Sequence, residues 1–204
     1  ISHNAVDDIG KDKIDDLSKK NILKKYGIPL NQPFFLYLGG YDERKNVRTL
    51  LNAYNAVIAG NYAYNLVLGG GKSLNKKLYK SYDEAETILK NDGRKLQGEI
   101  IKTGFIEEKD LPAIYQTAHA FITISWHEGC NLPLLEAINS GTATIASDLQ
   151  VHHEMVGVVP VYCDPMDEMK LAELLKRTII DQKFLNELKH RTESYEISFS
   201  WDKT

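Results

Sequence analysis

Residues 34–59 read FFLYLGGYDERKNVRTLLNAYNAVIA. The opening run, Phe34 to Leu38, is continuously apolar, which is typical of a strand buried on both faces of a parallel sheet. From Asn46 to Ala59 apolar residues recur with the i, i+3, i+4, i+7 spacing of an amphipathic helix. A loop beginning with two glycines joins the two segments. The stretch therefore predicts a strand, a loop and a covering helix, which together form one unit of an α/β fold.

The same alternation continues along the chain, because short apolar runs are separated by segments with helical periodicity. Right-handed helical crossovers between such strands build a parallel sheet with helices on both faces. We therefore predict an α/β fold, a Rossmann-like doubly wound parallel sheet of about six strands. The expected strands are 34–38, 66–68, 100–105, 120–124, 142–146 and 158–162, and the expected helices are 46–59, 73–89, 108–117, 132–140 and 166–180.

Residues 1–30 differ from the rest, because aspartates and lysines alternate there up to Gly27. We expect an irregular lead-in and one helix, with Gly27 closing the helix and the charges on a solvated face. The sequence shows no internal repeat and no low-complexity linker. It therefore predicts a lead-in at residues 1–30 and a single domain at residues 31–204.

Composition excludes several functional classes. The 25 basic and 28 acidic residues give a net charge of −3, with no basic stripe, which argues against a nucleic-acid partner. No run reaches the roughly 18 apolar residues of a membrane span. The two cysteines, Cys130 and Cys163, suit a reducing compartment, although the sequence leaves a single disulfide between them as an alternative. We expect a cytoplasmic location, with at most peripheral association at the inner face of the membrane. Because the chain begins without Met, we expect a piece of a longer protein.

Ligands of open α/β sheets bind beyond the carboxyl ends of the strands, so the loops after the strands are the places to search. The loop from Gly39 and Gly40 to Arg44 and Lys45 places two cations at the start of a helix. Helix N-termini attract anions, so a phosphate group suits this loop. In the other interpretation both cations are solvated and Asn46 only caps the helix. The loop alone does not choose between them.

A glycine cluster, Gly69-Gly70-Gly71-Lys72-Ser73, is similar to the end of a phosphate-binding P-loop. The full motif needs a further glycine at position 66, where the sequence has Leu66. We therefore favour a tight turn that needs positive φ over the site of an NTPase.

The most informative segment is residues 125–137, SWHEGCNLPLLEA. Glu128 lies in the loop after a predicted strand, and Glu136 lies about one turn into the next helix, with Asn131 as its expected cap and Pro133 in its first turn. Two carboxylates at one helix N-terminus can bind neighbouring hydroxyl groups of a polyol, while backbone amides face a phosphate. Alternatively, Glu136 is present only because a carboxylate suits the helix dipole.

Residues 128–137, followed by 140–142, resemble the E-x7-E signature of the retaining, GT-B-fold glycosyltransferases of family 4, also called group 1. Further segments follow that family's order, so the resemblance covers about residues 30–204, and residues 1–8 resemble its interdomain hinge. These segments are 36–39 with 44–46, 66–71, 104–105 with Leu111 and Tyr115, 145–148, 164–165 and 200–201.

The resemblance implies the C-terminal, donor-binding half of a GT-B enzyme, with the N-terminal acceptor domain absent and the last helix truncated. The implied reaction moves a sugar, with retention, from a UDP- or GDP-sugar to a glycan, lipid or other acceptor, as in a hexosyl- or mannosyltransferase. No metal or other cofactor is expected. This chain alone would bind the donor nucleotide and be nearly inactive. A module that binds nucleotide or sugar without transferring it is the alternative, and a P-loop-like NTPase is less favoured.

The resemblance also implies residue roles. Glu128 would act on the donor sugar and Lys45 on the diphosphate as catalytic residues, Glu136 would bind the ribose hydroxyls, and the amides of 131, 132 and 134 would face the phosphates. Two positions depart from the family, because Gly40 stands where Arg is usual and Cys130-Asn131 replaces Phe-Gly. The full set expected to bind the donor is Gly39, Gly40, Arg44, Lys45, Gly104, Phe105, Ile106, Glu128, Gly129, Cys130, Asn131, Leu132, Leu134 and Glu136.

Histidines give little support for a metal site. His152 and His153 are adjacent, and neighbouring residues on a helix point about 100° apart, so they do not converge on one ion. We expect surface or capping roles for both. His127 stands beside Glu128, where a structural role is the usual one for a loop histidine.

Overall fold

The computed structural model describes residues 12–70 and 98–195. Six strands form one parallel sheet in the order β3-β2-β1-β4-β5-β6. In this doubly wound order the chain starts in the middle of the sheet, builds one half and then builds the other. The predicted α/β fold is confirmed. The strands are β1 Phe34–Leu38, β2 Asn65–Gly69, β3 Ile100–Gly104, β4 Ala120–Thr123, β5 Thr144–Ser147 and β6 Val161–Cys163.

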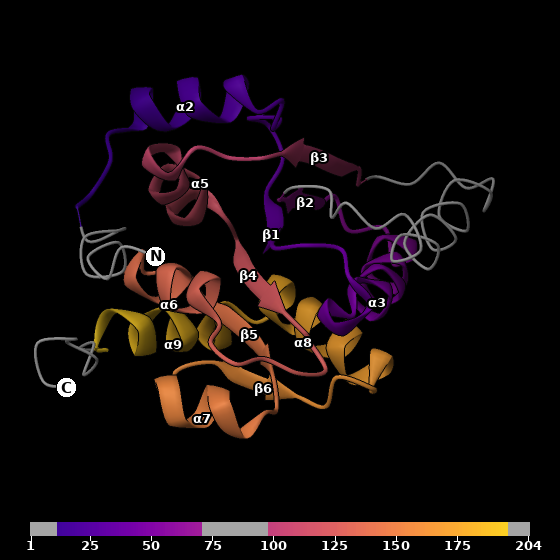
Figure 1. The fold of residues 1–204 in the computed structure, drawn as a ribbon. Coiled ribbons are helices and arrows are strands. Elements are labelled where there is room, and N and C mark those ends of the chain that lie inside the picture. Colours follow the sequence, from indigo (N-terminus) through magenta and orange to yellow (C-terminus); the bar gives the residue numbers. More distant parts are fainter. Residues whose placement is uncertain (1–11, 71–97, 196–204) are drawn as a thin grey trace, which may run out of the picture.

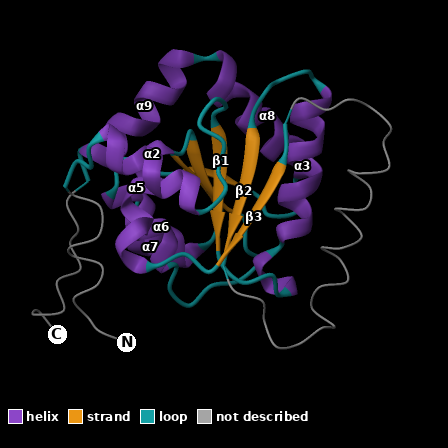
Figure 2. Ribbon diagram, turned by 90° about the horizontal axis from the view of Figure 1, so that it is seen from above, coloured by secondary structure: helices purple, strands orange, loops and turns teal. Residues whose placement is uncertain are grey.

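Helices cover both faces of this sheet (Figure 1). Seen from above, α3 lies on one side of the strands, and α2, α5, α6 and α7 lie on the other (Figure 2). Buried residues of α8 and α9 belong to the core on the α3 side. The helices are α2 Asp16–Lys25, α3 Val47–Ala59, α5 Leu111–Thr117, α6 Leu132–Asn139, α7 Gln150–Val156, α8 Glu168–Ile180 and α9 Gln182–Glu193, with short 3-10 turns η1 Glu43–Lys45 and η3 Glu108–Asp110.

Strand β1 shows why its sequence is continuously apolar. Phe35 and Tyr37 pack into the core beneath α3 and α8, whereas Phe34 and Leu36 pack into the core beneath α2 and α5. All four side chains are buried. Each such side chain stabilises the fold by roughly 1.5 to 3 kcal/mol relative to an exposed position. Burial on both faces therefore fixes this strand at the centre of the sheet.

The helix predicted before the domain is α2. Asp15 caps its first turn, because the carboxylate accepts hydrogen bonds from the Leu17 and Ser18 amides at 3.0 Å. Gly27 follows the last turn with φ of +68°, and the Ile28 amide reaches back to the Leu23 carbonyl at 2.9 Å. The prediction that Gly27 closes this helix is confirmed, because its left-handed conformation suits glycine.

Some predicted boundaries shift. Gly141 turns the chain at φ of +73°, so β5 begins at Thr144 rather than at 142. Gly157 turns it at φ of +57°, so the last strand begins at Val161 rather than at 158. Helix α9 was not predicted, although its buried residues Phe184, Leu185 and Leu188 have helical spacing. The helix expected at 73–89 lies outside the described residues.

None of the helices that the structure describes combines the length and the apolar composition needed to cross a membrane.

Candidate functional site

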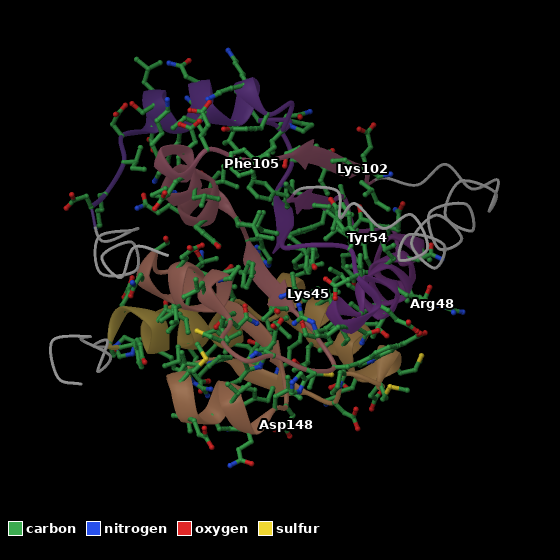
Figure 3. The ribbon with its side chains drawn as sticks, in the orientation of Figure 1. Lys45, Arg48, Tyr54, Lys102, Phe105 and Asp148 are labelled. Carbon is green, nitrogen blue, oxygen red and sulfur yellow. The ribbon has the colours of Figure 1, made fainter. Side chains whose placement is uncertain are left out.

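The two central strands point to the position of the site. β1 pairs with β4, and the chain leaves β1 toward α3 on one face and leaves β4 toward α6 on the other. Loops that diverge in this way open a crevice at the carboxyl edge of the sheet, where α/β proteins bind ligands. Lys45, labelled in Figure 3, lies in the loop after β1. The sequence-predicted loops after β1 and β4 therefore meet at one place.

Asn46 fastens these loops together. It adopts the left-handed conformation, with φ of 52° and ψ of 36°, which Asn tolerates better than most residues. Its buried amide group donates to the Ile124 carbonyl at 3.1 Å and to the Pro165 carbonyl at 2.7 Å. Asn46 occupies the N-cap position of α3 as predicted, but its side chain makes no capping hydrogen bond to the helix. Its side-chain amide group instead donates hydrogen bonds to the segments that follow β4 and β6. No local sequence pattern predicts these contacts.

Glu128 is the centre of the polar cluster in this crevice. Its carboxylate accepts hydrogen bonds from Arg44 Nη1, Lys45 Nζ and Ser125 Oγ, each at 2.7 Å. The Glu128 side chain is only 3% exposed, and that of Lys45 is 16% exposed. Arg44 also donates to the backbone carbonyl of His127 at 3.0 Å. The interpretation in which both cations are merely solvated is therefore wrong.

The charge of Glu128 depends on these partners. Burial by itself would raise the pKa of Glu128, but the hydrogen bonds from Lys45 and Ser125 and the nearby positive charges outweigh it and hold the pKa below its ordinary value. The carboxylate is therefore ionised near neutral pH. A buried anion with two adjacent cations is an arrangement that can bind a charged ligand by exchanging partners.

Glu136 lies about one turn into α6 in a different environment. Its Oε2 accepts a hydrogen bond from the hydroxyl of Tyr115 at 2.8 Å. Burial raises the pKa of Glu136, and the bond from Tyr115 opposes that rise only in part. The two carboxylates of the E-x7-E spacing are thus held by different partners, Glu128 by cations and Glu136 by a phenol.

Asn131 is confirmed as the cap of α6, because its Oδ1 accepts from the Leu134 amide at 3.4 Å, and Pro133 lies in the first turn as predicted. The backbone amide of Leu134 also donates to the Asn131 carbonyl at 3.0 Å. The resemblance implied that the Leu134 amide faces a phosphate. In this structure the amide points to Asn131.

His152 corrects a prediction made from sequence. It is fully buried, with Nδ1 2.8 Å from the Ser147 carbonyl and Nε2 3.1 Å from Asn131 Nδ2. Burial lowers the pKa of His152, which favours the neutral ring with Nδ1 donating and Nε2 accepting. The expected surface or capping role is wrong for His152. It holds for the half-exposed His153, whose Nε2 lies 2.6 Å from Asp148.

Sequence reasoning missed three residues that support this site, Thr123, Ser125 and His152. Asn131 Nδ2 donates to Thr123 Oγ1 at 2.9 Å as well as contacting His152. The replacement of the family's usual Phe-Gly by Cys130-Asn131 was the available signal, since a buried Asn requires hydrogen-bonding partners.

The glycines after β1 and β2 allow two backbones to approach closely. Gly39 donates to the Gly69 carbonyl at 3.0 Å, and Gly70 donates to the Gly104 carbonyl at 2.8 Å. Gly70 has φ of +133°, and a Cβ there would collide with the Gly39 carbonyl oxygen. This geometry supports the tight-turn interpretation for Gly70. Residues 71–73, the rest of the P-loop-like segment, lie outside the described residues.

The remaining residues predicted to bind the donor have different surroundings, and the structure does not gather them around Glu128. Gly104 turns the chain at φ of +69°, Phe105 is 77% exposed and Ile106 packs into the core. Figure 3 places Phe105 at the end of β3, away from Lys45. Of the others, Gly40 accepts a hydrogen bond from the Tyr37 hydroxyl, Gly129 and Cys130 are exposed, and Leu132 is half-buried.

Metal and disulfide chemistry find little support in the structure. No three His, Cys, Asp or Glu side chains converge on one point among residues 12–70 and 98–195. Metal independence nevertheless stays a prediction. Cys130 is exposed and Cys163 is buried, and both are free thiols, so they do not bridge.

Comparisons with known proteins agree on the family. A family model described as glycosyl transferases group 1 matches residues 18–195. The serotype-specific mannosyltransferase WbdA of Escherichia coli is 30% identical over 204 residues, which cover 98% of this chain and 23% of that protein. The chain therefore spans about a quarter of the length of this relative.

Solved structures share the fold. Sucrose-phosphate synthase from Thermosynechococcus elongatus matches with a TM-score of 0.71 at 22% identity, over 90% of this chain and 45% of that chain. The C-terminal domain of the group 1 family glycosyl transferase LpcC from Francisella tularensis matches with a TM-score of 0.71 at 20% identity, over 92% of this chain and 93% of that one. With the family model covering residues 18–195, the chain belongs to the group 1 family of glycosyl transferases.

Proposed function

We propose that this chain is the donor-binding, C-terminal half of a retaining glycosyltransferase that transfers mannose from a UDP- or GDP-activated donor to a glycan acceptor. The choice of mannose rests on the relative whose name describes it as a mannosyltransferase. The N-terminal acceptor domain, the retaining outcome, the absence of a metal requirement and the cytoplasmic location are parts of the same proposal.

The observation that carries the proposal is the cluster of Arg44 and Lys45 around the buried Glu128 at the junction of β1 and β4. A sugar nucleotide brings a diphosphate with negative charge and a sugar with hydroxyl groups. The two cations suit the diphosphate, and the carboxylate of Glu128 suits the sugar hydroxyls. One cluster therefore offers complementary groups to both parts of the donor.

Catalysis by such a cluster is electrostatic. Negative charge develops on the diphosphate as the bond to the anomeric carbon breaks, and fixed cations stabilise that charge. Lys45 is well placed for this role because its ammonium group is mostly buried and already oriented by Glu128 at 2.7 Å. Arg44, which is 43% exposed, would compensate for the glycine at position 40.

Glu136 would bind the ribose. An ionised carboxylate can accept hydrogen bonds from two neighbouring hydroxyls, each worth roughly 1.5 to 3 kcal/mol in the absence of competing water. Its position about one turn into α6 places it in the helix that follows the Glu128 loop. In this proposal Glu136 binds the ribose of the donor and Glu128 binds its sugar.

Calorimetric titration of this chain with GDP, UDP and ADP, each with and without EDTA, tests the donor part. Binding of GDP or UDP that survives EDTA and is lost in Lys45→Met and Glu136→Gln supports the proposal. Lys176→Met and Glu173→Gln, at exposed positions of α8, are the matched controls and should bind as the wild type does. Binding of ADP alone, or equal binding in all four variants, would overturn it.

The transfer part requires the full-length protein. It should consume a mannose nucleotide in the presence of a mannose-containing acceptor, and NMR of the product should show the anomeric configuration of the donor. A full-length protein that binds the nucleotide but consumes no sugar nucleotide would instead identify the alternative, a binding module, which the glycine at position 40 favours.

A further inference from the structure

A cavity lies beside the proposed donor site. It has a volume of about 230 Å³ and is formed by the loop after β1, the loop after β4 and the turn between β6 and α8. Its lining contains none of Arg44, Lys45 and Glu128. The residues that line it are Tyr41, Asp42, Glu43, Asn46, Val47, Arg48, Thr49, Trp126, Met166 and Glu168.

The lining combines an apolar surface with hydrogen-bond acceptors. Trp126 is 41% exposed and Met166 is 71% exposed, so both side chains present apolar surface at the cavity. Asp42, Glu43 and Glu168 contribute carboxylates. Sugars have the matching chemistry, since an apolar face of C–H groups packs on an aromatic ring while hydroxyl groups donate to carboxylates.

The charge of this cavity distinguishes its ligand from the donor diphosphate. Three acidic residues and one basic residue, Arg48, line it, which gives a formal charge of −2. Figure 3 shows Arg48 reaching outward from the start of α3. An anionic diphosphate would be repelled, whereas a neutral polyol would not. The cluster around Glu128 has the opposite character, because two cations accompany its single carboxylate.

Hydrogen bonds fix the walls of the cavity in place. The Trp126 amide donates to the Arg44 carbonyl at 2.9 Å, which ties the loop after β4 to the loop after β1. Asn46 donates to the Pro165 carbonyl at 2.7 Å, which ties the β6 turn to the same loop. Asn52 Nδ2 donates to Glu168 Oε1 at 2.8 Å and orients that carboxylate. Preformed walls lower the entropic cost of binding.

The volume limits the ligand to a small unit. Pockets for drug-sized molecules measure roughly 300 to 1,000 Å³, so a cavity of about 230 Å³ fits a single sugar residue better than a nucleotide. Trp126 stands two positions before Glu128, and Arg44 Nε lies 3.5 Å from Asp42 Oδ1, so the cavity and the Glu128 cluster share these loops. We propose that this cavity is a saccharide subsite that binds one neutral hexose unit of the acceptor glycan beside the donor sugar. Its assignment to the acceptor rests on the proposed function, whereas saccharide binding itself does not.

Titration of the ¹⁵N-labelled chain with an α-linked mannotriose, followed by NMR, tests the subsite. The indole N–H signal of Trp126, assigned by its loss in Trp126→Phe, should shift at millimolar sugar, both with and without saturating GDP. Trp126→Ala and the conservative Glu168→Gln should each weaken the sugar affinity by about tenfold. Met169→Ala, at an exposed position of α8 outside the cavity lining, is the control and should leave it unchanged.

The outcomes separate this proposal from the donor proposal. Mannotriose binding that persists in Lys45→Met, which should abolish GDP binding, supports a distinct subsite. Sugar that leaves the Trp126 signal unmoved, or that binds equally to wild type, Trp126→Ala and Glu168→Gln, would overturn it. Tighter binding of tetramethylammonium than of mannotriose would also overturn it, because an acidic, aromatic cavity would then be a cation site.

In the full-length enzyme, Glu168→Gln should raise the acceptor KM about tenfold while leaving the KM for the nucleotide sugar unchanged. An unchanged acceptor KM would place the acceptor elsewhere and remove the acceptor assignment.

Discussion

The hydroxyl of Tyr115 donates a hydrogen bond of 2.8 Å to Glu136 Oε2 from a fully buried ring. Burial raises the pKa of Glu136, and this bond is the contribution that opposes the rise. Tyr115 lies on α5 and Glu136 on α6, so the packing of two helices sets the charge state of the carboxylate that we assign to the ribose.

Replacing Tyr115 with Phe should make nucleotide binding more sensitive to acid. Without the hydroxyl the pKa of Glu136 rises further, so the ionised form needed for the ribose hydroxyls is lost at a higher pH. We expect the GDP or UDP affinity of Tyr115→Phe to fall by about tenfold near pH 6, the scale of one hydrogen bond to a charged group. Calorimetry from pH 5.5 to 8 checks this. A parallel loss at every pH would mean that the hydroxyl only shapes the site.

Glu136→Gln should be more stable than the wild type at pH 8 and should bind nucleotide poorly. A carboxyl whose pKa is raised on folding binds more protons in the folded state, so its contribution to stability falls as pH rises through the folded value. Gln avoids that cost and can still accept from Tyr115. Urea unfolding at pH 5 and pH 8 measures the difference, which should shrink at the lower pH. A less stable variant at pH 8 would contradict this reasoning.

Glu128→Gln should separate stability from nucleotide binding. Although burial opposes the change, the pKa of Glu128 is lowered in the folded protein. Its contribution to the free energy of unfolding is therefore present above the ordinary carboxyl pKa and is lost as pH falls through the pKa of the folded state. The variant leaves Arg44 and Lys45 without their anion. We expect the free energy of unfolding to fall by less than the roughly 3 to 5 kcal/mol that breaking a fully buried ion pair costs, because Arg44 is 43% exposed.

The same variant should bind GDP or UDP at least as tightly as the wild type, since both cations are released for the diphosphate. In the full-length enzyme it should transfer little sugar. Calorimetry and a transfer assay measure the two effects. Weaker nucleotide binding together with normal transfer would contradict the assignment of Glu128 to the sugar.

The buried His152 and the partly buried His119 should make the protein sensitive to mild acid. Burial lowers the pKa of His119 to about 4 and also lowers that of His152. The unfolded chain, whose histidines titrate near the ordinary value of about 6.5, then binds more protons, so stability falls as pH drops below that value. The urea midpoint should decline from pH 6.5 to 5 in the wild type and less steeply in His119→Gln and His152→Gln. Equal slopes in all three proteins would show that other groups cause the decline.

Gly70→Ala should destabilise the fold, because the added Cβ meets the Gly39 carbonyl oxygen and φ is +133°. We expect the free energy of unfolding to fall by at least about 1 to 3 kcal/mol, the usual cost of one strained backbone position. Gly129→Ala is the control, since nothing lies within 4 Å of a Cβ placed there. Urea unfolding compares them, and equal stability would mean that the two strand ends can separate freely.

Much of the fold follows from local pattern. The apolar run of β1 and the periodic residues of α3 are short-range signals, since burial on both faces and helical spacing are written in consecutive residues. Gly27 and Asn131 could be assigned to helix ends because their conformations and side chains suit those positions. Boundaries near Gly141 and Gly157 failed because apolar residues continue past the turns that these glycines make.

The sequence by itself determined the alternation of strands and helices, and placed Glu128 in a loop and Glu136 about a turn into a helix. Only the tertiary structure decided that Glu128 accepts a hydrogen bond from Lys45, which is 83 positions away. It also decided that His152, on another helix, contacts the amide group of Asn131. These contacts require β1 to lie beside β4 and α7 to pack near α6, arrangements set by burial of the whole sheet between two helical layers. Periodicity is a property of neighbours in the chain, whereas the partner of a buried charge is chosen by the packing that brings distant segments together.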